Sequence, residues 1–79
     1  MTKQESDQLI AEARKYIGQL YRASDGNGNV LEVSEFVATN ENGSNGNYEP
    51  EALFRSDTGE FWARDLRNTV ALYRVWFTN

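Results

Sequence analysis

Oxygen-bearing side chains follow one another closely in the segment SDGNGNVLEVSEF. A calcium-binding loop of the EF-hand type needs oxygen ligands at positions 1, 3 and 5, glycine at position 6 and a bidentate glutamate at position 12, between two helices. With Gly28 at position 6, Asp25 and Asn27 occupy positions 3 and 5, but position 1 is Ala23 and position 12 is Ser34. The residues that follow alternate like a strand, so the segment predicts a hairpin turn, and we expect no calcium binding.

Histidine and cysteine are both absent from the 79 residues. The commonest general base, the commonest metal ligand and the best nucleophile are therefore missing. The only lysines, Lys3 and Lys15, lie in a segment that is typical of a surface helix. We expect no catalytic site, no cofactor and no metal site, so the protein is predicted not to be an enzyme.

Acidic residues are concentrated in the middle of the chain. Residues 25–60 hold eight acids against Arg55 alone, a net charge of −7, and the remaining segments sum to +3, which gives the overall charge of −4. We expect an acidic central face that binds a protein partner with a basic surface. Its candidate residues are Glu32, Glu35, Glu49, Glu51, Asp57 and Glu60. The alternative is that these acids only solvate strand edges and loops.

Aromatic residues next to arginine form a second candidate surface. Such pairs can stack on bases and hold phosphates, which would make the protein a nucleic-acid-binding module. The candidates are Tyr21, Arg22, Trp62, Arg64, Tyr73 and Arg74. The same aromatics can instead be core residues whose neighbouring arginines point to water. The negative net charge makes nucleic acid the less favoured partner.

The chain begins with a predicted helix over residues 4–17. Thr2 and Glu5 have the spacing of a capping box, apolar residues then recur at helical spacing, and Gly18 is suited to end the helix. This first segment lacks the apolar centre of a signal peptide, and no apolar run approaches the roughly 20 residues that cross a membrane. We therefore expect a cytoplasmic protein without a membrane partner.

The rest of the chain predicts short strands. Their expected ranges are residues 19–24, 29–39, 51–56, 60–66 and 69–77, with a mobile loop over residues 40–50. A β-bulge near Ser34 would place the apolar residues of the second strand on one face. The last segment also fits helical spacing, so a helix is the alternative there. The fold class is α+β in one domain, with the helix packed on a small barrel or strongly bent antiparallel sheet. The expected core residues are Phe36, Phe54, Trp62, Leu66 and Trp76.

Several short motifs over residues 18–66 resemble a family. They are Gly18-x-x-Tyr21-Arg22, then Phe36-Val37-Ala38, Leu53-Phe54-Arg55 and Gly59-x-x-Trp62-x-Arg64-x-Leu66. In this order they resemble a small bacterial and prophage domain of unknown function with a curled SH3-like sheet. Asp65 stands where that family has proline, and the asparagine- and glycine-rich loop is an insertion. The resemblance implies an SH3-like fold and a phage or prophage setting, and it implies no catalytic residues.

Overall fold

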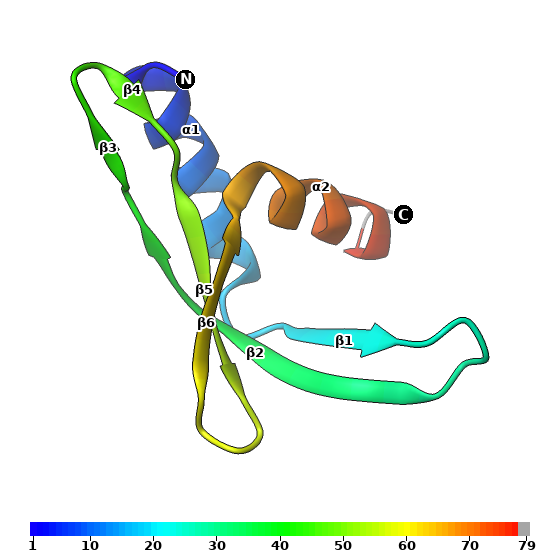
Figure 1. Cartoon of the computed structure of the whole chain (residues 1–79). Helices are drawn as coiled ribbons and strands as arrows, with labels where there is room; N and C mark the ends of the chain where they lie inside the picture. Colours follow the sequence, from blue (N-terminus) through cyan, green and yellow to red (C-terminus); the bar gives the residue numbers. More distant parts are fainter. Residues whose placement is uncertain (78–79) are drawn as a thin grey trace.

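The structure is a computed structural model and describes residues 1–77 (Figure 1). Its elements are α1 (Lys3–Ala13), a 3-10 turn (Arg14–Tyr16), β1 (Leu20–Ser24), β2 (Val30–Asn40), β3 (Gly43–Ser44), β4 (Asn47–Tyr48), β5 (Glu51–Ser56), β6 (Phe61–Asp65) and α2 (Leu66–Phe77). The predicted α+β class is confirmed.

Helix α1 starts at the predicted capping box. The Thr2 hydroxyl accepts a hydrogen bond from the backbone N–H of Glu5 at 3.2 Å, and the Glu5 carboxylate accepts one from the N–H of Thr2 at 3.1 Å. These two bonds satisfy donors that the first helical turn leaves free. Gly18 follows the 3-10 turn with a φ of +98°, a conformation that glycine adopts without strain. The helix predicted over residues 4–17 is confirmed, with its last turn in the tighter 3-10 form.

Strands β1, β2, β5 and β6 form one antiparallel sheet in the order β1-β2-β5-β6. The hairpin that joins β5 to β6 turns at Gly59, whose φ is +88°. Four of the five predicted strands are thereby confirmed. Strands β1 and β6 are the two edges and do not pair with each other, so the sheet is bent and not a closed barrel. Figure 1 shows β2 curving away from β5 while α1 and α2 lie together on one side of the sheet.

The irregularities of β2 lie elsewhere than predicted. Ser34 pairs regularly with Tyr21 on β1, whereas the pairing with β5 shifts between Phe36 and Ala38, which leaves Val37 as the extra residue. Ser34 and Phe36 are both buried. The strand therefore alternates regularly through Ser34, and the predicted bulge there is wrong.

Residues 69–77, predicted as a strand, belong to helix α2. The Asp65 carboxylate accepts hydrogen bonds from the backbone N–H groups of Arg67 at 2.8 Å and Asn68 at 3.3 Å, which caps the start of the helix. The buried positions then recur at helical spacing, at Leu66, Thr69, Val70 and Tyr73. Capping and burial on one stripe outweigh the strand preference of the β-branched and aromatic residues.

Residues 40–50 are also more ordered than predicted, because they hold the small β3–β4 hairpin. Its turn is Asn45-Gly46, with φ values of +53° and +78°, which is the backbone that a two-residue hairpin turn requires. The hairpin is held to the start of α1, where the amine of Met1 donates to the carbonyl of Tyr48 at 3.1 Å. The prediction of a mobile loop overlooked this Asn-Gly signal.

The core lies between the sheet and the two helices. Its buried apolar residues are Ile10, Ala13, Tyr16, Phe36, Ala52, Phe54, Leu66, Val70 and Tyr73. The predicted core positions of Phe36, Phe54 and Leu66 are confirmed. Trp62 is half-buried and packs against this core. Trp76 is 43% exposed, so its assignment to the core is wrong; it lies on α2 beyond the buried stripe that ends at Tyr73.

Candidate functional site

Aromatic side chains bridge the open side of the sheet. The ring of Tyr21 on β1 lies 5.5 Å from that of Trp62 on β6 and 6.0 Å from that of Trp76 on α2, measured between ring centres. Arg64 on β6 donates a hydrogen bond to the Tyr21 hydroxyl at 2.8 Å. Side chains therefore connect the two edge strands, although their backbones do not pair.

Arg64 is a half-buried cation within this bridge. Its guanidinium carbon lies 5.2 Å from the centre of the Tyr21 ring, and no carboxylate among residues 1–77 forms an ion pair with it. The aromatic face and the phenol oxygen of Tyr21 supply the electron-rich surroundings that the charge needs. This contact places Arg64 in the packing of the domain.

Tyr73 lies beneath the bridge and is fully buried. Its hydroxyl has no hydrogen-bond partner among the described residues. Burial, with a smaller contribution from the nearby Tyr21, raises the pKa of Tyr73 to about 12. The phenol is therefore neutral at physiological pH and cannot act there as a base.

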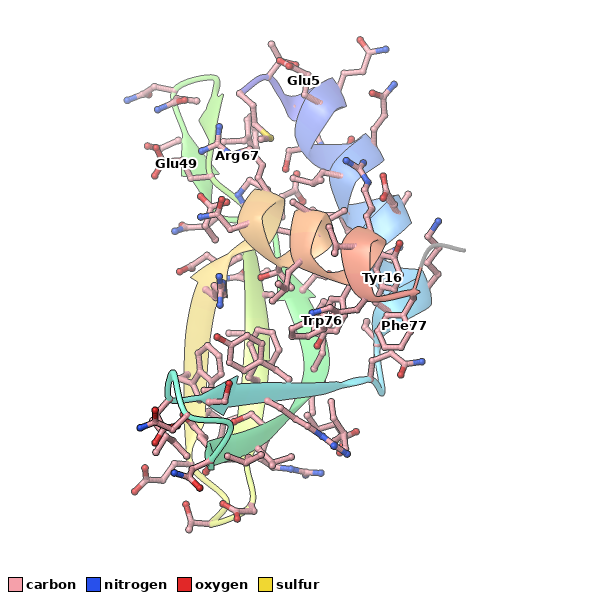
Figure 2. The ribbon with its side chains drawn as sticks, turned by 90° about the vertical axis from the view of Figure 1, so that its right-hand side faces the viewer. Glu5, Tyr16, Glu49, Arg67, Trp76 and Phe77 are labelled. Atoms are coloured by element: carbon pink, nitrogen blue, oxygen red, sulfur yellow. The ribbon has the colours of Figure 1, made fainter. Side chains whose placement is uncertain are left out.

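A groove opens beside the aromatic bridge, between β1 and the end of α2. It has a volume of about 370 Å³ and is lined by Gln19, Leu20, Arg22, Trp76 and Phe77. Figure 2 shows Trp76 and Phe77 together at the end of α2. The size is within the lower range of ligand pockets and suits one large side chain of a partner. We call this feature the β1–α2 groove.

One cation lines the β1–α2 groove, and a second lies outside the lining, next to an aromatic ring that stacks on Phe77. Arg22 lines it directly, while Lys15 Nζ lies 5.4 Å from the ring centre of Tyr16. Tyr16 in turn stacks against Phe77 at 6.3 Å, and Figure 2 shows these two rings side by side. Neither Arg22 nor Lys15 forms an ion pair with another of the described residues. The groove is therefore apolar with a positively charged rim.

The six candidate residues of the aromatic and basic surface divide into three places. Four of them, Tyr21, Trp62, Arg64 and Tyr73, belong to the aromatic bridge and the core below it. Arg22 lines the β1–α2 groove. Arg74 binds the Glu12 carboxylate on α1, with its Nε 2.6 Å from Oε2. The structure therefore brings four of the six together, mainly as packing residues.

The six candidate acids are also divided. Glu49 lies beside β3 and β4 at the far end of the molecule from the β1–α2 groove (Figure 2), and Glu51 accepts a hydrogen bond there from Asn42. Glu32 accepts one from the hydroxyl of Ser34, on the inner face of β2. The structure leaves three of the six close to one another.

Those three acids are Glu35, Asp57 and Glu60. Glu35 and Asp57 line a shallow depression on the outer face of the sheet, and Glu60 follows in the same β5–β6 turn. Arg55 pairs with Glu35 at 3.3 Å and offsets one of the three charges. This group, which we call the outer acidic cluster, is what remains of the expected acidic face.

The segment around Asp25 that was compared with a calcium-binding loop forms the turn between β1 and β2. The Asp25 carboxylate accepts hydrogen bonds from the backbone N–H of Asn27 at 2.8 Å and from that of Asn29 at 3.1 Å. The side chain of Asn29 also donates to it, and these bonds lower the pKa of Asp25. Asp25 thus shapes the turn, and strands flank it on both sides as predicted.

The groove residues Leu20 and Phe77 are not among the predicted site residues, and Trp76 was predicted to lie in the core. The available signal was weak: Leu20 adjoins the candidate Tyr21, and Trp76 and Phe77 end the last apolar segment. Their proximity depends on α2 folding back over β1, which the sequence pattern did not predict.

Comparison of the chain with protein-family models, with curated proteins and with solved structures finds no match in any of the three. The resemblance to a small prophage domain therefore stays a prediction from the motifs. None of the helices within residues 1–77 has the length and apolar character that spanning a membrane requires.

Proposed function

We propose that this chain is a small interaction protein without catalytic activity, which binds a protein partner at the β1–α2 groove. The observation that carries the proposal is the gathering of exposed apolar side chains there. Five of the eight large exposed apolar residues belong to the two segments that meet at the groove: Ile17, Leu20, Val75, Trp76 and Phe77. Three of them, Leu20, Trp76 and Phe77, line the groove together, and exposed apolar surface of this kind is typical of protein–protein contact sites.

The chemistry of the lining supports binding and not catalysis. Arg22 and Gln19 supply a guanidinium and an amide, while the other lining residues are apolar. Neither polar group can accept a proton near neutral pH, and neither is a nucleophile. An aromatic wall with a single arginine is the composition that dominates binding energy at protein interfaces.

A phage or prophage setting forms part of the proposal only through the resemblance of the Gly18-x-x-Tyr21-Arg22 and Gly59-x-x-Trp62-x-Arg64 motifs. Within that setting, the partner would be a protein of the bacterial host.

A second candidate function uses the outer acidic cluster to bind a basic partner. It is favoured by the position of Asp57 and Glu60, which form no ion pair among residues 1–77 and lie at the tip of the β5–β6 hairpin. Exposed charges of this kind act mainly on the rate of association. The β1–α2 groove has in addition the apolar area that affinity requires, which is why we rank it first.

Selection from a random peptide library on the immobilised protein tests the proposal. Selected peptides should shift the amide resonances of Leu20, Arg22 and Phe77, and Trp76→Ala should weaken binding at least about tenfold, as loss of a buried aromatic anchor does. Shifts confined to Asp57 and Glu60 would favour the second candidate. Selected peptides that leave all of these amides unmoved would contradict both.

A further inference from the structure

We propose that the partner presents to the β1–α2 groove a segment in which a large apolar side chain adjoins a carboxylate. This inference rests on the proposed function and adds the chemistry of the ligand.

The polar rim of the β1–α2 groove has one sign. Arg22 lines it and none of the lining residues among residues 1–77 is acidic, while Lys15 lies outside the lining, over the Tyr16 ring that stacks on Phe77. The whole chain carries a charge of −4, so an arginine that lines this groove without an ion-pair partner among residues 1–77 is a local exception, although Glu35 lies opposite Leu20 on the neighbouring strand. A partner that buries the apolar walls also removes water from these cations, and a carboxylate offsets that cost.

The apolar walls determine the other half of the ligand. Leu20 and Trp76 are each 43% exposed and Phe77 is 48% exposed, although all three are large apolar residues. A volume of about 370 Å³ accepts one leucine-sized or aromatic side chain. The ligand therefore needs an apolar residue as anchor and the acid beside it.

Nucleic acid fits this surface less well. Binding of a polyanion requires several phosphates to be neutralised together. Strand β1 offers Arg22 alone and is followed by Asp25, and Glu32 lies opposite Ala23 on β2. A chain of phosphates that continued along β1 would therefore meet negative charge, whereas a short acidic peptide would not.

A second copy of this chain is also disfavoured. A two-fold contact through the groove would place the same patch opposite itself. Both halves of the contact would then carry Arg22 and no acid from the described lining, and two positively charged surfaces that are brought together lower affinity.

Three capped hexapeptides that share a central leucine test the ligand chemistry. They differ in the residues beside the leucine, which are glutamate, glutamine or lysine, and single-stranded oligothymidylate is the fourth probe. Each is titrated into the full chain at about 0.1 M salt, where the screening length is about 10 Å, while amide resonances are followed. The glutamate peptide should shift the amides of Gln19, Leu20 and Arg22. It should bind at least about fivefold more tightly than the glutamine peptide and about tenfold more tightly than the lysine peptide, as expected for charge pairs at a partly desolvated rim.

Charge variants provide the matched controls. Arg22→Glu, at an exposed position, should weaken the glutamate peptide at least about fivefold and strengthen the lysine peptide. Arg67→Glu, an exposed arginine at the other end of α2, should leave both affinities within about twofold, because ten helical residues, about 15 Å, separate it from Phe77, which exceeds the screening length of about 10 Å at 0.1 M salt. Unchanged amide spectra outside the groove verify that each variant is folded.

The outcomes separate the two proposals. If all three peptides bind equally at the groove, or the lysine peptide binds best, the ligand chemistry is wrong while groove binding stands. If oligothymidylate shifts the groove amides more strongly than any peptide, the ligand is nucleic acid and the inference is overturned. If no probe reaches the groove while library-selected peptides do, the inference fails alone; if those also fail, the proposed function fails with it.

Discussion

At the end of the protein where α1 begins, Lys3 Nζ lies 2.9 Å from a Glu41 oxygen and 3.1 Å from an Asp7 oxygen, and the amine of Met1 donates to the carbonyl of Tyr48. The two carboxylates raise the pKa of Lys3, with Glu41 contributing most. At the groove end, Arg22 and Lys15 have no such partners among residues 1–77.

This contrast separates structural from binding surface. Polar groups that find partners within the chain have no need of a second molecule, whereas apolar walls beside unpaired cations gain from one. The first end, which we call the β3–β4 end, is therefore expected to serve stability, and the groove end is expected to serve recognition.

The largest predicted loss of stability is at Tyr73, which lies in the core beneath the aromatic bridge. Tyr73→Ala should lower the free energy of unfolding by about 3–5 kcal/mol, because it empties a fully buried aromatic site. The ring stacks on Tyr16 at 5.3 Å and on Phe36 at 5.8 Å. Urea unfolding followed by circular dichroism measures the change. A loss below about 1 kcal/mol would show that the groove extends down to Tyr73 and that this residue is not core.

Removal of the β3–β4 hairpin should have the next largest effect. Replacement of residues 43–48 by a short glycine linker should cost about 1–2 kcal/mol, because Met1 loses its bonds to Asn47 and Tyr48. Binding at the groove should stay within about twofold. A thermal melt and a peptide titration measure the two quantities. A large loss of binding with a small loss of stability would reverse the assignment of the two ends.

A smaller, pH-dependent effect is expected between the helices. The hydrogen bond from Arg74 lowers the pKa of Glu12, so the pair stabilises the folded state above the ordinary glutamate pKa and stops doing so as the pH falls through the lowered value. At pH 7, Glu12→Gln should cost about 0.5–1 kcal/mol, since both side chains are partly exposed. Thermal midpoints of both proteins should converge as the pH falls below the lowered pKa of Glu12. A gap that is unchanged at low pH would show that the pair adds no charge-dependent stability.

The smallest predicted change in stability comes from removing the hydroxyl of Tyr73 while its ring is kept. Because the hydroxyl has no partner, Tyr73→Phe should leave stability within about 0.5 kcal/mol, on the stabilising side. Chemical denaturation of Tyr73→Phe and Tyr73→Ala gives the separate contributions of the hydroxyl and of the ring to the free energy of unfolding. A loss above about 1 kcal/mol would mean that the phenol is hydrogen-bonded in solution.

Local signals predicted the parts of the fold that depend on neighbours in sequence. The capping box of Thr2 and Glu5 predicts the start of α1, and the turn that ends at Gly59 predicts the β5–β6 hairpin. Each signal spans three to five residues, and the structure contains both. The Asn45-Gly46 turn is an equally local signal, but the polar residues around it were interpreted as a loop.

Helix α2 was mispredicted for a different reason. Its β-branched and aromatic composition favours a strand, and only the Asp65 cap and burial against α1 and the sheet make the helix the stable form. The β1–α2 groove could not be predicted either, because Leu20 and Phe77 come together only through the packing of α2 against α1 and against β5 and β6. Acids or arginines that are close in sequence can lie on opposite faces of the sheet, because side chains alternate along a strand, as Glu32 and Glu35 on β2 show.

The position of Tyr21 between the two tryptophans gives the protein a pair of optical probes. Trp62 is half-buried against the Phe54 ring at 4.4 Å, with its indole N–H bonded to Ser34, so its fluorescence should follow unfolding. Trp76 forms a wall of the groove and is more exposed to water, so a ligand should shift its emission to shorter wavelength. Tyr21 lies within energy-transfer distance of both. Trp76→Phe and Trp62→Phe would each leave one reporter, so that parallel titrations of the two variants record the integrity of the sheet and the occupancy of the groove separately.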